Sequence, residues 1–129
     1  MSLADPADFP RAFANAFSAR DLGAVGRLFT PDADFVSLTG AWAEGREAVE
    51  EVLAAELAGT LARVKLVTGR TRLRAVAPGV AQVLQRFVLS GLSHPDGSDA
   101  GRVGVILAAL LREGAEGWLA VSAQFSPEG

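Results

Sequence analysis

Two ionisable side chains lie in apolar stretches that could line a ligand-sized cavity. Asp34 alternates with Val36 and Leu38, so these side chains share one face of the strand that we predict there. If that face lines a cavity, the exclusion of water from the carboxylate would make Asp34 suitable as a general acid or base. Arg86 lies beside Leu84 in an apolar strand, where a guanidinium could hold a ligand carboxylate or enolate through paired hydrogen bonds. The simpler alternatives are a solvated carboxylate at a strand start and an ion pair at the sheet edge.

Aromatic and amide side chains give the other candidate ligand contacts. Trp42 follows Gly40 in a turn, where an indole could close a cavity mouth or simply pack in the core. Phe17 and Phe35 could touch a ligand, although a packed helix and strand need such rings for their core. Gln124 could donate a hydrogen bond to a ligand carbonyl or face water. We therefore predict catalytic roles for Asp34 and Arg86 and ligand binding by the other four residues: Phe17, Phe35, Trp42 and Gln124.

Composition excludes several kinds of chemistry. The 129 residues contain no Cys and one His, which removes disulfides, thiolate chemistry and zinc sites that need two imidazoles. The single imidazole, His94, falls in the turn sequence 94–97, so we expect it to face solvent. A net charge of −3 disfavours nucleic acid as a partner. No glycine motif for nucleotides is present, and we predict neither a metal nor a cofactor.

The elements that would position these residues change in kind along the chain. We predict a helix from Asp5 to about Ala19, with an aromatic stripe spaced every four residues, and a second helix that Asp21 caps and Thr30-Pro31-Asp32 ends. A short strand at 34–38 and a third helix from Arg46 to about Ala58 follow.

The second half has the pattern of long antiparallel strands. Apolar segments at 61–76, 80–92, 102–112 and 118–125 are separated by turn sequences. Helices followed by strands predict one α+β domain over residues 1–129, with three helices on one face of a strongly curved antiparallel sheet. The strands are apolar on both faces, so we expect a homodimer through the sheet. The sequence shows neither a leader peptide nor a membrane span, and we expect a cytoplasmic protein without a membrane partner.

Four segments resemble the nuclear transport factor 2-like superfamily, in particular its SnoaL-like and SgcJ/EcaC-type bacterial branches. They are residues 16–21 (AFSARD), 28–35 (LFTPDADF), 40–49 (GAWAEGREAV) and 118–121 (WLAV). The resemblance implies a cone-shaped sheet wrapped on the first and third helices. It also implies an internal cavity for a small, largely apolar ligand.

The resemblance does not carry a known mechanism to this chain. In the ketosteroid isomerases of the superfamily, the catalytic tyrosine would fall on Phe13, the base on Ser37 and the late acid near Ala108, so that mechanism is excluded. A His-Asn-Thr-like triplet of SgcJ-like relatives corresponds to 124–126, where an amide replaces the imidazole. We predict a small-molecule-binding protein. As an extension of this prediction, the protein would catalyse isomerase- or cyclase-like proton transfer without a cofactor. The alternative is a non-catalytic dimerisation module whose cavity is filled by side chains.

Overall fold

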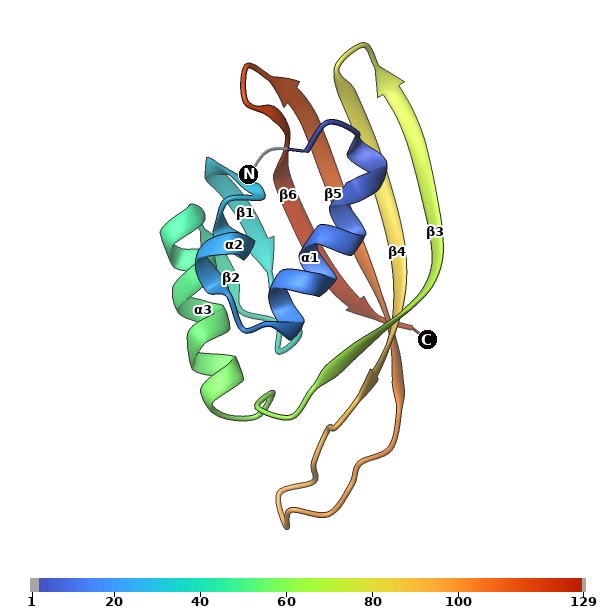
Figure 1. The fold of residues 1–129 in the computed structure, drawn as a ribbon. Helices are drawn as coiled ribbons and strands as arrows, with labels where there is room; N and C mark the ends of the chain where they lie inside the picture. Colours follow the sequence, from blue (N-terminus) through green and yellow to red (C-terminus); the bar gives the residue numbers. More distant parts are fainter. Residues whose placement is uncertain (1–2, 129) are drawn as a thin grey trace.

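The computed structural model describes residues 3–128. Helical elements precede most of the sheet: a 3-10 turn η1 (Pro6–Asp8), α1 (Phe9–Ser18), α2 (Leu22–Gly26) and α3 (Arg46–Ala58). The strands are β1 (Phe29–Val36), β2 (Trp42–Glu44), β3 (Lys65–Ala77), β4 (Val80–Ser90), β5 (Val103–Gly114) and β6 (Gly117–Pro127). They form one sheet in the order β2-β1-β6-β5-β4-β3, which is not closed (Figure 1). The predicted α+β class with three helices on a curved sheet is confirmed.

The first two helices begin where the sequence predicts. The Asp5 carboxylate accepts a hydrogen bond from the Ala7 N–H at 2.9 Å, and Asp21 accepts one from the Ala24 N–H at 3.0 Å. The second helix is shorter than expected, because the chain enters β1 at Phe29 instead of continuing as helix. The third helix has the predicted bounds.

The first strand differs from the prediction in length and in pairing. Thr30-Pro31-Asp32, which we expect from the sequence to end a helix, lies within β1. Pro31 is accommodated because the pairing of β1 with β6 is irregular between Phe29 and Asp34. This pairing is parallel, so the sheet is mixed and the prediction of a wholly antiparallel sheet is wrong. The short β2, which pairs antiparallel with β1, is an element that the sequence analysis does not predict.

The four long strands form the predicted antiparallel meander, and Figure 1 shows them curling around α1. At the turn that includes His94, the Gly97 N–H donates to the His94 carbonyl at 2.8 Å, which confirms the predicted turn. Figure 1 shows this β4–β5 connection extending beyond the end of the sheet.

Phenylalanine side chains build the core between α1 and the sheet. All seven are buried: Phe9, Phe13, Phe17, Phe29, Phe35, Phe87 and Phe125. Phe13 lies in the middle, with ring centroids 5.8 Å from Phe125 and 6.4 Å from Phe35. These rings fill the interior between α1 and the sheet, where the family resemblance implies a ligand cavity.

Candidate functional site

A hollow of about 320 Å³ lies at the end of the phenylalanine core. Its walls come from the turn after β1, the segment after α3, and the end of the meander beside the β4–β5 connection. Thr39, Thr60, Ser93 and Ser126 supply its side-chain hydroxyls. The apolar wall includes Leu38, Leu61, Leu89, Leu92, Val105 and Phe125. A largely apolar concave surface with a few polar groups is the usual form of a small-molecule site.

A buried carboxylate stands behind the polar wall of this hollow. Glu56 of α3 is 8% exposed. Its Oε2 accepts hydrogen bonds from the Ser37 hydroxyl at 2.6 Å and from the Thr39 hydroxyl. The Ser37 hydroxyl also accepts from the Ala41 N–H at 3.1 Å. We call Glu56, Ser37 and Thr39 the Glu56 cluster. It ties the turn after β1 to α3, and through Thr39 it reaches the hollow.

The Glu56 carboxylate is incompletely satisfied. Its Oε1 is buried and has no hydrogen-bond partner. Within residues 3–128 the ion pairs are Arg11–Asp8 and Arg86–Glu128, so no cation lies within 4.0 Å of Glu56. A buried carboxylate without a counter-charge is costly to maintain, and such groups are commonly kept for a ligand or a specific contact.

The helix period places Glu56 in the core. Val49, Leu53 and Glu56 are the buried residues of α3, and they follow one another at intervals of four and three residues. Sequence reasoning missed Glu56 because it assigned the core face of this helix from apolar residues alone. A glutamate on the apolar stripe is the signal that could have found it.

Asp34 and Arg86 lie on the outer face of the sheet, and Asp34 has the arrangement of the simpler alternative, an exposed carboxylate. Along β1 it is Ala33 and Phe35 that are buried, whereas Asp34 is exposed and accepts a hydrogen bond from the Trp42 indole N–H at 2.9 Å. Trp42 itself is 67% exposed and contributes nothing to the wall of the hollow. This pair therefore joins β1 to β2 on the outside of the molecule.

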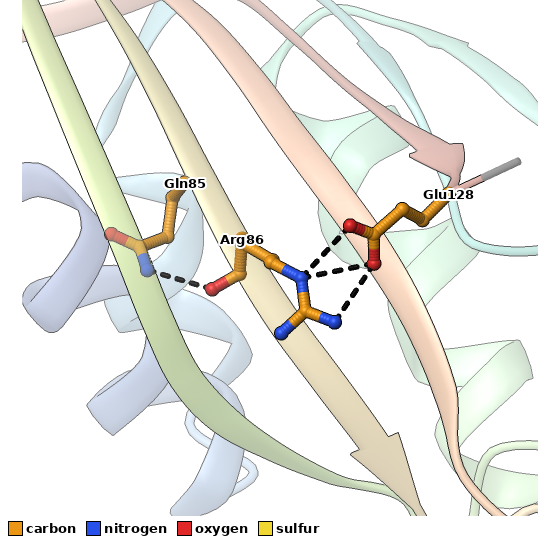
Figure 2. Close-up of polar contacts among 3 residues, drawn as sticks. All are labelled: Gln85, Arg86 and Glu128. Atoms are coloured by element: carbon orange, nitrogen blue, oxygen red, sulfur yellow. Dashed lines mark hydrogen bonds and ion pairs between the residues drawn. The ribbon is translucent and has the colours of Figure 1, made fainter.

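Arg86 forms an ion pair, which is the simpler alternative that the sequence left open for it. Its guanidinium contacts the Glu128 carboxylate, with Nη2 to Oε1 at 2.9 Å, and Figure 2 shows both side chains on the side of β4 away from Gln85. The hydrogen bond between them raises the pKa of Arg86 above its ordinary value and lowers that of Glu128. Gln85 turns the other way and donates to the Gly69 carbonyl at 3.2 Å.

The remaining predicted contacts are also separated from the hollow. Phe17 and Phe35 are fully buried in the core, as their structural interpretation expected. Gln124 is exposed on β6, although its neighbour Phe125 lines the hollow. The structure thus does not bring the six predicted site residues together, and the sequence analysis selected neither Glu56 nor the four hydroxyl residues that line the hollow. No helix among the described residues is long and apolar enough to cross a membrane.

Comparison with known proteins identifies the family. A family model described as a SnoaL-like domain matches residues 7–128. This bears out the superfamily resemblance, and the SgcJ/EcaC-type branch remains a prediction. No curated protein matches the sequence.

Several solved structures are similar in fold. An uncharacterised protein with a cystatin-like fold from Caulobacter vibrioides is 20% identical, with a TM-score of 0.85 over 95% of this chain and 87% of that one. The hexachlorocyclohexane dehydrochlorinase LinA-type3 from Novosphingobium barchaimii is 10% identical, with a TM-score of 0.82 over 95% and 84%. Aln2 from a Streptomyces species is 14% identical, with a TM-score of 0.76 over 98% and 94%. At these identities the likeness establishes the fold alone.

Proposed function

The chain belongs to the SnoaL-like domain family, and from that premise we propose that its hollow binds a small, mostly apolar molecule. The observation that carries the proposal is the hollow itself. Its volume of about 320 Å³ lies at the lower end of the range of ligand sites, which begins near 300 Å³. Its wall combines leucine, valine and phenylalanine residues with two threonines and two serines. The packed phenylalanine core between α1 and the sheet is what the interaction module predicts, so the ligand-binding proposal depends on the hollow at the end of that core.

A neighbour in fold supports a ligand of this kind. The dehydrochlorinase is named for hexachlorocyclohexane, a compact molecule without hydrogen-bonding groups. A fold shared at 10% identity does not transfer that substrate, but it supports a site for small apolar molecules on this scaffold.

A thermal-shift screen with hydrophobic enones, polyketide-like aromatics and fatty acids tests the proposal. A ligand present at 100 times its dissociation constant stabilises the folded state by about 2.7 kcal/mol, which is easily seen as a rise in Tm. Leu92→Trp should fill the hollow and abolish the rise. Val76→Trp, at an exposed position on β3, is the matched control and should keep it. Ligands that still bind the Leu92→Trp variant, or a complete absence of ligands, would contradict the proposal.

Proton transfer by Asp34 and Arg86 stays a prediction, and their outer positions do not support it. Asp34 is exposed and hydrogen-bonded to Trp42, and Arg86 is paired with Glu128. For binding in the hollow, Asp34→Ala should leave ligand affinity unchanged. A loss of affinity in that variant would mean that the ligand lies on the outer face instead.

We also propose that the outer face of the sheet joins two copies of the chain. Val67 of β3 and Leu110 of β5 are exposed there, and Leu84 of β4 and Ile106 of β5 are only half-buried. Arg72, Arg86 and Glu128 lie beside Leu84 and Ile106 on this face. Apolar side chains left exposed and interspersed with charged ones are common in the interfaces of dimers. Sedimentation at micromolar concentration should give twice the chain mass of 13.4 kDa, and Ile106→Glu should give the monomer. A single 13.4 kDa species for the unmodified chain would exclude the dimer.

A further inference from the structure

We propose that the hollow selects molecules that join an apolar body to a protonated amine, and that the Glu56 cluster recognises the ammonium group. This inference rests on the proposed function, because it names the chemical class of the ligand for the same hollow. It depends on three features: the direction of the Thr39 hydroxyl, the missing counter-charge of Glu56, and the absence of charged side chains from the wall.

Toward a ligand in the hollow, the Thr39 hydroxyl can act only as a hydrogen-bond acceptor. A threonine hydroxyl has one proton to donate and two lone pairs to accept with. In this structure the proton goes to the Oε2 atom of Glu56. Thr39 also lines the hollow and is exposed, so what remains for a ligand is the accepting side of an oxygen atom polarised by a carboxylate. Such an oxygen binds donors and repels other acceptors.

The other hydroxyl of the cluster is already fully engaged. Ser37 donates to Glu56 and accepts from the Ala41 N–H, which leaves it with no proton for a ligand. The two hydroxyls therefore stabilise the carboxylate from one side only. The Oε1 atom remains buried without a donor.

The charge of the ligand follows from the electrostatics of the wall. No Asp, Glu, Lys or Arg is among the described residues that line the hollow, and Glu56 stands directly behind Thr39. Glu56 is buried, and a buried carboxylate acts over several ångströms because water screens it less than at the surface. An ammonium group beside Thr39 would supply the counter-charge that the described residues do not provide, whereas a carboxylate ligand would be repelled.

A purely structural role for the Glu56 cluster makes a different prediction. The cluster could serve only to hold the turn after β1 against α3. In that case changes at Glu56 would alter the stability of the fold and leave ligand preference untouched. Ligand selectivity, not stability, is therefore the property that distinguishes the two roles.

Three probes of nearly equal shape provide the measurement: cyclohexylmethylamine, cyclohexylmethanol and cyclohexanecarboxylate. Their dissociation constants would be determined at pH 7 by calorimetry, with NMR shifts at Leu92 and Phe125 to locate the binding. We expect the amine to bind about tenfold more tightly than the alcohol, because hydrogen bonds backed by a charge are the stronger ones. The carboxylate should bind more weakly than either.

Two variants and a matched control assign the preference. Glu56→Gln keeps the shape of the side chain and removes its charge, and Thr39→Val removes the accepting oxygen at an exposed position. Glu56→Gln should bring the affinity for the amine down to that for the alcohol and leave the affinity for the alcohol unchanged. Thr39→Val removes an acceptor that both probes can use, so it should weaken both and abolish the advantage of the amine over the alcohol. Glu51→Gln removes the same charge from an exposed position on the same helix and should change neither affinity. If Glu56→Gln does not fold, Thr39→Val still decides the question.

The outcomes separate this inference from the proposed function. Equal binding of amine and alcohol, or an amine preference that survives in both variants, would overturn the ammonium proposal while leaving a functional hollow. Absence of NMR shifts at Leu92 and Phe125 with every probe would also overturn it. In that case the proposed function would stand or fall on its own screen with the Leu92→Trp variant.

Discussion

Truncation of Phe13 tests the packing on which the rest of the structure depends. This side chain is 0% exposed, and its ring lies 5.8 to 6.4 Å from the rings of Phe9, Phe17, Phe35 and Phe125. Removing a buried phenylalanine ring costs about 3–5 kcal/mol, because apolar surface is lost and a cavity remains. Each lost ring pair adds up to about 1 kcal/mol, and the contributions overlap because the neighbours relax together. We therefore expect Phe13→Ala to lower the free energy of unfolding by about 4–5 kcal/mol.

Urea denaturation at one fixed protein concentration measures this loss. At this chain length about 1 kcal/mol corresponds to roughly 4 °C, so the Tm should fall by about 15–20 °C. The matched control is Trp42→Ala, which removes an aromatic ring that is 67% exposed and should cost less than about 1 kcal/mol. A loss below about 1.5 kcal/mol for Phe13→Ala would refute the packed core, since it would mean that the neighbouring rings do not depend on Phe13.

Two further predictions concern the ion pair and the turns. Arg86 lowers the pKa of Glu128, so the stability that this carboxylate contributes is present at pH 7 and is lost as the pH falls below the ordinary glutamate pKa through the lowered value. The difference in unfolding free energy between the unmodified chain and Glu128→Gln should therefore be measurable at pH 7 and absent at pH 2, and an equal difference at both would contradict the pairing. Gly91 and Gly97 both have positive φ, at +82° and +86°, but a Cβ at Gly91 would overlap the Arg63 carbonyl whereas one at Gly97 meets nothing within 4 Å. Gly97→Ala should cost about 1–2 kcal/mol in urea denaturation and Gly91→Ala about 1–3 kcal/mol more, and equal costs would contradict the close approach of the backbone at Gly91.

Local sequence patterns predict the helices and the meander well. They fail for the strand β1, whose partner strand β6 is distant in the sequence. The third helix is predicted at both ends because Gly45 and Gly59 flank a continuous helical period. The first strand contains Pro31, which by itself indicates a break, and its partner β6 lies at the other end of the chain. Parallel pairing of that kind leaves no periodic trace in the strand that it recruits. Its presence and direction were therefore visible only in the structure.

The sequence left open which face of the first strand lines the interior, because alternation in a strand gives two faces without saying which one is buried. Asp34 with Val36 forms one set and Phe35 with Ser37 the other, and both sets contain an apolar residue. The second set is buried because Phe35 completes the ring cluster around Phe13. A shift of one residue in this choice moves Asp34 from the cavity to the surface and brings Ser37 inside.

The same shift explains how a polar site arises in this core. Once Ser37 faces inward, its hydroxyl needs a buried partner, and the helix period supplies one by placing Glu56 rather than a leucine on the core stripe of α3. Neither residue indicates chemistry when it is considered alone, since serine is common in turns and glutamate is common on helices. Their meaning comes from the contact between segments 19 residues apart, which leaves the other carboxylate oxygen buried without a partner, while Thr39 links the carboxylate to the hollow. A charged residue at a core position of a helix is therefore a stronger indication of a site in this chain than a charged residue at the start of a strand, because the fold must satisfy the first and can leave the second in water.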